Sequence, residues 1–317
     1  MWRYLLSRLF YFVPIAIGVS LVCFALVHVA PGEPIDAILP DNATPELVEQ
    51  VKAEYGFDKP LSMQYLIWVG NVMTGDFGRS ITTNRPVLQE LMPAMFNSLV
   101  LAVVAIFLAM VAGVLLGWIA GKTQNRLLDR FVSSIAITGV SVPHYWLGMV
   151  LIIFFSVELG WLPSVGMGSG GSTEFNFSMD SFAHMILPVI TLTVIPTGII
   201  ARSVRAAVSE VYQKEFVQAL YAKGLNQRRI ILHVAKNVAP VVMSIMGLQF
   251  AQLMGGSILV ETVFSWPGTG FLLNSAIFTR DLPVLQGTIL VLSMFFVVIN
   301  LLVDLLQMSV DPRVKRK

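Results

Sequence analysis

Six long apolar stretches alternate with polar segments along the chain. A bilayer core requires about 20 apolar residues per helix, and each stretch approaches or exceeds this length. The pattern therefore predicts an all-α integral membrane protein with six transmembrane helices. The predicted spans cover residues 9–30, 97–120, 132–157, 184–201, 238–260 and 284–308.

Prolines interrupt two of these stretches. The third contains Pro143, and the fourth contains Pro188 and Pro196. Because proline lacks the amide donor that a helical residue supplies, we expect breaks or kinks at these positions. Pro240 is expected to open the fifth span.

Two polar segments are long enough to hold structure of their own. The outer segment contains Thr44-Pro45-Glu46, which is typical of a helix start with threonine as N-cap, so short helices are expected there. The inner segment 202–237 is the most charged part of the chain. The chain is accordingly divided into an N-terminal amphipathic segment with the first span (1–30), an outer, periplasmic segment (31–96), a core of five helices (97–308) and a basic tail (309–317).

Composition excludes several classes of protein. Hydrophobic residues make up 56% of the 317 residues and charged residues 13%, whereas soluble domains carry about 25% charged residues. This balance argues against a soluble enzyme, a disordered chain and a nucleic-acid partner, and it predicts a lipid environment. The single cysteine, Cys23, lies in an apolar run and is interpreted as a packed hydrophobic residue.

The distribution of Lys and Arg predicts an orientation. With an inner N-terminus, 16 of the 21 basic residues fall in the inner segments 1–8, 121–131, 202–237 and 309–317. Cytoplasmic loops carry an excess of Lys and Arg. We therefore expect both termini to be cytoplasmic.

Motifs for catalysis or cofactor binding are absent from the sequence. It contains no HExxH, CxxC or GxSxG, and its four histidines are scattered, so no catalytic or metal-binding residue is predicted. The run from Gly117 to Thr123 resembles a phosphate-binding loop, but it is one residue short and ends a membrane helix. No acidic residue lies near the centre of a span, which argues against an ion-coupled carrier. Any energy source is therefore expected on a partner.

Small residues recur every four positions in two spans. Such faces let two backbones approach closely in lipid, either within one subunit or against a second subunit around a pathway, and the sequence leaves both alternatives open. The two stripes are Ala105, Ala109, Gly113, Gly117 and Gly121, and Gly247, Ala251 and Gly255.

The inner segment predicts a short amphipathic helix near residues 212–225. Phe216, Val217, Leu220 and Tyr221 follow helical spacing, and Gly224 is a natural helix stop. Asn226 is then expected to cap a second helix that carries Arg228 and Arg229. Such a helix suits docking into a groove of a partner protein, or it lies on the membrane surface.

From Gln218-Ala219 to Gly224, with Pro240 beyond, the chain resembles the EAA signature of ABC-importer permeases. Further motifs make it similar to the first permease subunit of the dipeptide/oligopeptide/nickel transporters. These motifs are spread along the whole chain: residues 28–34 (HVAPGEP), 75–80 (GDFGRS), 141–148 (SVPHYWLG), 184–188 (HMILP), 222–225 (AKGL), 261–270 (ETVFSWPGTG) and 311–313 (DPR).

The chain departs from the general signature at two points. The signature has Glu-Ala-Ala where this chain has Gln218-Ala219-Leu220, and Glu215 comes three positions earlier. Pro240 follows Gly224 by 16 residues, whereas the signature has 13. The departures leave the contribution of each motif residue open, but not the location of the coupling helix.

The resemblance implies the type I importer fold and a set of partners. A second homologous permease subunit would complete the pathway, two cytoplasmic ATPase subunits would hold ATP and Mg, and a periplasmic or extracellular binding protein would deliver the solute. Peptides, nickel chelates, glutathione and opines are the solutes that similar permeases carry. The residues that would meet the ATPase are Glu215, Phe216, Ala219, Leu220, Lys223, Gly224, Arg228 and Arg229.

The outer end of the fifth span carries the most specific motif. Its residues are expected to close an outer gate or to contact the binding protein, or Trp266 anchors a loop at the membrane interface. The motif residues expected at this gate or contact are Glu261, Phe264, Trp266, Pro267 and Gly268.

Two other functions are rivals to an ABC-importer permease. They are an ion-coupled secondary carrier and a membrane scaffold without transport.

Overall fold

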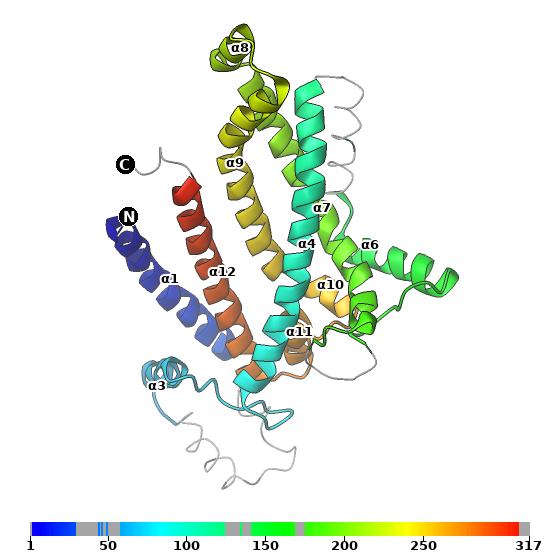
Figure 1. The fold of residues 1–317 in the computed structure, drawn as a ribbon. Coiled ribbons are helices and arrows are strands. Elements are labelled where there is room, and N and C mark those ends of the chain that lie inside the picture. The colour runs from blue at the N-terminus through cyan, green and yellow to red at the C-terminus, as the bar shows by residue number, and fades with distance from the viewer. Residues whose placement is uncertain are drawn as a thin grey trace. The chain divides into compact units, whose positions relative to one another are not determined.

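The computed structural model describes residues 2–29, 44, 46, 49, 58–123, 134, 141–168 and 175–310. In these ranges the regular structure is helical, apart from an isolated antiparallel bridge between Arg79 and Pro86. The helices are α1 (Trp2–Val29), α3 (Leu61–Met73), α4 (Val87–Thr123), α6 (His144–Leu151), the π-helix η2 (Ile152–Glu158), α7 (Met179–Tyr212), α8 (Glu215–Ala222), α9 (Gln227–Gly256), α10 (Ile258–Val263), α11 (Thr269–Phe278) and α12 (Leu282–Val310) (Figure 1).

Four described helices are long and apolar enough to cross a membrane: α4, α7, α9 and the Leu282–Val303 part of α12. They contain, wholly or in large part, four of the predicted spans. Shorter apolar stretches, Val13–Ala25 and His144–Glu158, overlap the other two. Six spans therefore remain a prediction. Three predicted parts lie outside the described residues. They are residues 132–140 except 134, most of the helix predicted from Thr44, and residues 311–317 of the tail.

Prolines do not end the long helices. α7 continues through Pro188 and Pro196, and α9 begins at Gln227 and continues through Pro240. The expectations of a break in the fourth span and of a new span starting at Pro240 are therefore wrong, whereas the alternative of a kink at Pro188 or Pro196 stays a prediction. Each proline removes one backbone hydrogen bond, but buried residues lie before and after it on both helices, so packing on both sides supports the helix through the proline.

The third predicted span does break at its proline. Residues 142 and 143 are non-helical, and α6 begins at His144 with Pro143 as its N-cap. The helix then changes to π geometry over Ile152–Glu158. The hydrophobic pattern contained no signal for this change, because the pattern does not distinguish one helical hydrogen-bonding scheme from another.

Contacts divide the chain into two compact units. The first comprises residues 1–97, 173–175 and 267–297, and the second comprises residues 98–172, 176–266 and 298–317. In the first unit, α3 packs against α1, and a small core forms around Val87, Ala276 and Val284 with Phe77 against it. Helix α11 and the first part of α12 supply most of this core.

In the second unit, α7 packs along α9 and also contacts α6 and α10. The small-residue stripe of α4 faces α7. A methyl group added at Gly113 would lie 2.8 Å from Ile200 Cβ, and one at Gly117 would lie 2.4 Å from the carbonyl oxygen of Ala201. Of the two alternatives for this stripe, packing inside one subunit or against a second subunit, the structure shows packing inside one subunit.

Candidate functional site

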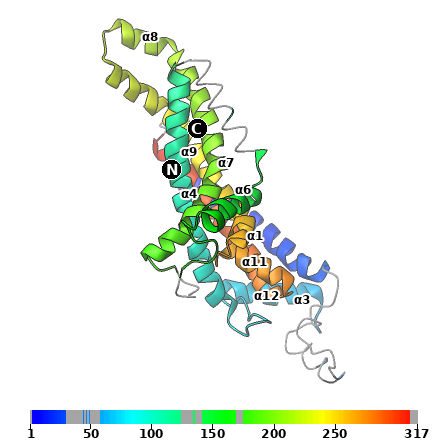
Figure 2. The same ribbon diagram turned by 90° about the vertical axis from the view of Figure 1, so that its right-hand side faces the viewer.

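The predicted amphipathic helix is present as α8, which joins the end of α7 to the start of α9 (Figure 1 and Figure 2). α7 ends at Tyr212, two residues make the turn, and α8 starts after Lys214 with Glu215 in its first turn. An acidic residue there is favourable because the helix N-terminus carries a partial positive charge. Lys214 also pairs with Glu210 at 3.0 Å. The sequence thus encodes an elbow between two long helices.

Gly224 ends α8 in a Schellman motif. Its backbone has φ +73°, the Gly224 amide donates to Tyr221 at 2.9 Å, and the Leu225 amide donates to Leu220 at 3.2 Å. A methyl group added at Gly224 would meet nothing within 4 Å. Glycine is therefore favoured here by the backbone conformation, and no crowding inside the chain demands it.

Asn226 then caps α9 as expected. Its side chain accepts a hydrogen bond from the Arg229 amide at 3.0 Å. Arg228 and Arg229 both lie exposed on the first turn of α9. The cap therefore fixes the start of a new helix after a connection of four residues, 223–226, and it places two cations beside the elbow.

One member of the apolar stripe on α8 is fully buried, whereas the others are half-buried or exposed. Val217 is 1% exposed, whereas Phe216 is 37% and Tyr221 46% exposed. Val217 thus anchors α8 to the fold. The sequence pattern alone did not distinguish it from the other apolar residues of this helix. Of the other residues predicted to meet the ATPase, Leu220 is half-buried and the rest are exposed. The exposed ones are Glu215, Ala219, Lys223, Gly224, Arg228 and Arg229.

α9 connects this elbow to the second predicted group. The helix has 30 residues, which corresponds to about 45 Å of axial length. It ends at Gly256, and Ser257 serves both as its C-cap and as the N-cap of α10, which carries Glu261. α8 and Glu261 are therefore far apart, near opposite ends of one continuous helix.

Glu261 is fully buried and bridges two elements. Its Oε1 atom accepts hydrogen bonds from the hydroxyls of Ser98 at 2.7 Å and Ser257 at 2.8 Å. Ser98 belongs to α4, and Ser257 lies in the break between α9 and α10. A carboxyl taken out of water needs such donors, because burial without them is costly. We call Ser98, Ser257 and Glu261 the Glu261 clamp.

The aromatic residues of the same motif are also buried. Phe264 is 1% and Trp266 0% exposed, while Ser265 between them is exposed and has φ +46°. The carbonyl of Phe264 accepts from the Gly166 amide at 2.8 Å. A methyl group added at Gly148 would lie 3.0 Å from the Phe264 ring. Two motifs more than a hundred residues apart in sequence therefore meet at Phe264.

Pro267 and Gly268 belong to the first unit. The Asn97 side-chain amide donates to the Pro267 carbonyl at 2.7 Å, and Gly268 precedes α11 as its N-cap. Pro267 is half-buried and Gly268 is buried.

The 75–80 motif of the first unit forms a compact turn fastened to Asp281. The carboxylate accepts from the Ser80 hydroxyl at 2.5 Å and from the Thr82 amide at 3.1 Å, and Asp281 also precedes α12. Its other oxygen lies 3.4 Å from the Val284 amide. Asp281 and Ser98 were missed as structural residues. Asp281 before Leu-Pro is a recognisable helix start, whereas Ser98 carries no local signal.

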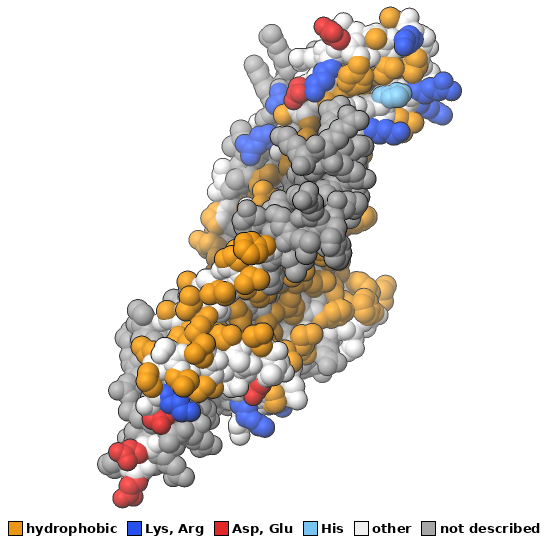
Figure 3. Space-filling model, turned by 90° about the vertical axis from the view of Figure 1, so that its left-hand side faces the viewer, with side chains coloured by type: hydrophobic (Ala, Val, Ile, Leu, Met, Phe, Trp, Pro, Cys, Tyr) orange, Lys and Arg blue, Asp and Glu red, His pale blue; other side chains and the backbone are white. Residues whose placement is uncertain are grey.

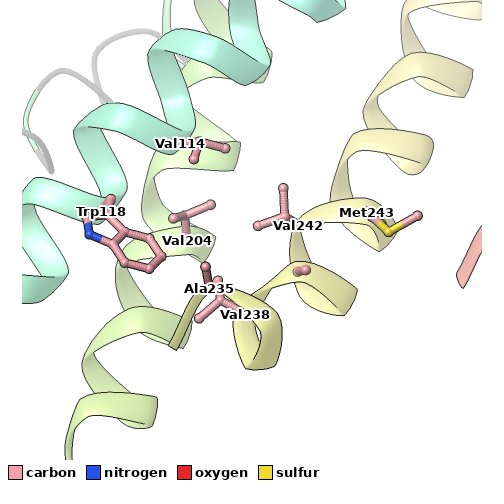
Figure 4. A pocket seen from close by; sticks show the side chains of 8 residues that line it. Val114, Trp118, Val204, Ala235, Val238, Val242 and Met243 are labelled. Atoms are coloured by element: carbon pink, nitrogen blue, oxygen red, sulfur yellow. The ribbon is translucent and has the colours of Figure 1, made fainter. Parts of the chain in front are cut away.

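An apolar groove of about 210 Å³ lies among α4, α7 and α9 (Figure 4). The indole nitrogen of Trp118 is the one polar side-chain atom among its lining residues. A peptide would need several hydrogen-bonding groups, so no solute contact is assigned to this groove. It is lined by Val114, Trp118, Val204, Ala235, Val238, Ala239, Val242 and Met243.

Residues 113–316 match the family described as binding-protein-dependent transport system inner membrane component, and residues 1–102 match the N-terminal part of such components. Curated relatives cover the whole chain. The dipeptide transport system permease protein DppB of Alkalihalophilus pseudofirmus is 37% identical over 99% of this chain and all of its own length. The glutathione transport system permease protein GsiC of Escherichia coli is 38% identical over the full length of both chains.

Solved structures show the same fold. A chain of the MetNI methionine ABC transporter, in an inward-facing conformation, matches with a TM-score of 0.57 and 19% identity, over 71% of this chain and 97% of its own. Members of the matched family are transmembrane components and not themselves enzymes. The chain thus belongs to the binding-protein-dependent transport system inner membrane components, the permease subunits of ABC importers.

Proposed function

We propose that this permease forms half of the translocation pathway of an importer for peptides or peptide-like small solutes in a bacterial inner (cytoplasmic) membrane. Full-length relatives named for dipeptide and glutathione transport support this substrate class. A second homologous permease completes the pathway, and a periplasmic or extracellular binding protein delivers the solute. Two cytoplasmic ATPase subunits hold ATP and Mg. Both termini lie on the cytoplasmic side, as the excess of Lys and Arg in the inner segments indicates.

The ATPase docks on α8. This helix presents Phe216, half-buried Leu220 and the small residue Ala219, which suit insertion into an apolar groove. Glu215, Lys223, Arg228 and Arg229 surround them with charges that set the electrostatic register of the two subunits. Because Gly224 has no side chain, the ATPase surface approaches the backbone closely at the end of α8.

The observation that carries this proposal is the continuity of α9. ATP binding closes the ATPase pair, and its differential affinity for the closed and open pairs shifts the equilibrium between two states of the transporter. A displacement of α8 reaches the Glu261 clamp through one unbroken helix of 30 residues. The break at Ser257 lets α10 change its angle there while α9 moves as a rigid element.

Substitution of Gly224 in the complete transporter tests the docking role. Asn tolerates positive φ, so Gly224→Asn keeps the turn but adds a side chain toward the ATPase, whereas Gly224→Val also strains the backbone. We expect both variants to lose ATPase stimulation by the loaded binding protein in proteoliposomes. Gly160→Asn is the matched control, because Gly160 also has positive φ and open space around it. Normal stimulation in Gly224→Asn would refute close docking at this position.

The Glu261 clamp acts as part of the outer gate. Burial of Glu261, Phe264 and Trp266 favours a gate over direct contact with the binding protein. The clamp joins α4 to the α9–α10 break, so its release would allow the two to separate.

Ser98→Ala removes one bond of the clamp. A hydrogen bond to a buried carboxyl contributes about 1–3 kcal/mol, which is roughly 5-fold to 150-fold in a two-state equilibrium. We therefore expect a several-fold rise in ATPase activity without the binding protein. Thr262→Ala is the control. Thr262 lies beside Glu261 in α10, and its hydroxyl donates to the Ile258 carbonyl instead of to the clamp. This variant should leave the basal ATPase activity unchanged. Equal basal activity in the two variants would count against the gate.

A further inference from the structure

α3 is a predominantly apolar helix. Its sequence, LSMQYLIWVGNVM, contains no charged residue, and none of its residues is buried in the fold. A helix with so many apolar residues belongs in a protein core or in lipid. The charged residues Asp58, Lys59 and Asp76 lie just beyond its two ends.

One face of α3 rests on α1. The Tyr65 hydroxyl hydrogen-bonds the Ser20 hydroxyl at 2.8 Å, and Phe24 contacts the rings of Tyr65 and Trp68 at centroid distances of 5.5 and 6.1 Å. These contacts fix which part of α1 the short helix touches. Both helices belong to the first unit.

The opposite face of α3 exposes large apolar side chains. Leu66 is 63%, Met73 84%, Met63 50% and Ile67 39% exposed. With Gly70 they share one side of the helix, since their positions fall at helical spacing. In the space-filling view, hydrophobic side chains gather on the exposed surface of the chain (Figure 3).

The contact points on α1 set the depth of α3. Ser20 and Phe24 precede the end of α1 at Val29 by nine and five residues, about 14 and 8 Å along the axis. The hydrocarbon core is about 30 Å thick. If α1 crosses the membrane, as its apolar pattern predicts, a helix resting on these two residues lies below the headgroups. With 13 residues, α3 is about 20 Å long and too short to span the core.

We propose that α3 is an interfacial membrane helix embedded in the outer leaflet, with Met63, Leu66, Ile67 and Met73 in contact with lipid acyl chains. The segment between the first and second spans is thus not wholly aqueous. Lipid is favoured over a protein partner because α1, on which α3 rests, also exposes large apolar side chains, among them Val13, Ile17, Leu21 and Val22.

Spin labels in the complete transporter, reconstituted in vesicles of phosphatidylethanolamine and phosphatidylglycerol, test this placement. Cys23 is the only cysteine, so Cys23→Ala with cysteine-free partner subunits supplies a background. Labels are placed at Leu66→Cys and, as a second site on the same face, Met63→Cys. Val22→Cys on α1 is the lipid reference, and Asp58→Cys is the aqueous reference. Collision with oxygen and with a water-soluble nickel chelate is measured at each site.

The ratio of oxygen to nickel accessibility at Leu66 and Met63 should match that at Val22 and exceed that at Asp58 roughly tenfold, because polar solutes are excluded from hydrocarbon. A ratio like that of Asp58 would overturn the proposal. Low accessibility to both reagents would also overturn it, since a partner subunit would then cover α3. An aqueous ratio at Val22 would overturn it as well, because the part of α1 on which α3 rests would then lie outside the lipid.

Discussion

Gly117 allows α4 and α7 to approach until backbone meets backbone. A methyl group at this position would lie 2.4 Å from the Ala201 carbonyl oxygen and 2.8 Å from Val204 Cβ, whereas ordinary contact begins at 3.4 Å. Gly117→Ala therefore requires the two helices to separate by about 1 Å here. The obstacle is a carbonyl group in a helix, which cannot rotate away as a side chain would.

Two contributions of opposite sign determine how much Gly117→Ala changes the free energy of unfolding. Overpacking of a close contact costs about 1–3 kcal/mol, and a backbone obstacle places this site at the upper end. Alanine gains about 1 kcal/mol over glycine in a helix interior. We expect Gly117→Ala to destabilise the permease by about 2 kcal/mol net.

Thermal unfolding of the assembled transporter in nanodiscs measures this effect. Gly117→Ala should lower the midpoint by several degrees. Gly255→Ala is the control, because Gly255 lies in a helix with nothing within 4 Å of an added methyl group, and it should be neutral or slightly stabilising. Gly247→Ala, where the nearest atoms belong to the Val303 side chain, should fall between them. If Gly117→Ala is as stable as Gly255→Ala, the packing argument is wrong.

Three further substitutions test individual contacts. Asp281→Ala removes the acceptor for Ser80 and Thr82 as well as a carboxylate at the start of α12; we expect about 2 kcal/mol of destabilisation and faster proteolysis of the 75–86 turn, and unchanged proteolysis would contradict this role. Asn226→Ala removes the cap of α9 and should lower the free energy of unfolding by about 1 kcal/mol. A thermal midpoint equal to that of the control Asn237→Ala would disprove this expectation. Gly148→Ala presses on the Phe264 ring at 3.0 Å and should lower the midpoint by a smaller amount than Gly117→Ala; a larger drop would show that the ring cannot yield.

Local signals predicted much of this protein. Apolar runs located four long helices, and the spacing of Phe216 to Tyr221 with Gly224 and Asn226 predicted α8 and the start of α9, because caps and stops act within a few residues. Helix continuity was less predictable. Proline lowers local helix stability, yet packing on both sides carries α7 and α9 through it.

Contacts between distant residues required the tertiary structure. The sequence showed that Gly113, Gly117 and Gly121 share a face, but the fold determined that this face meets α7. The sequence placed Val217 in an apolar stripe, but only packing distinguished it from exposed Phe216. Ser98 has no local pattern at all, and its role at Glu261 comes from the approach of α4 to α10. Periodicity assigns a residue to a face of its own helix, whereas the partner of that face depends on how the whole chain packs.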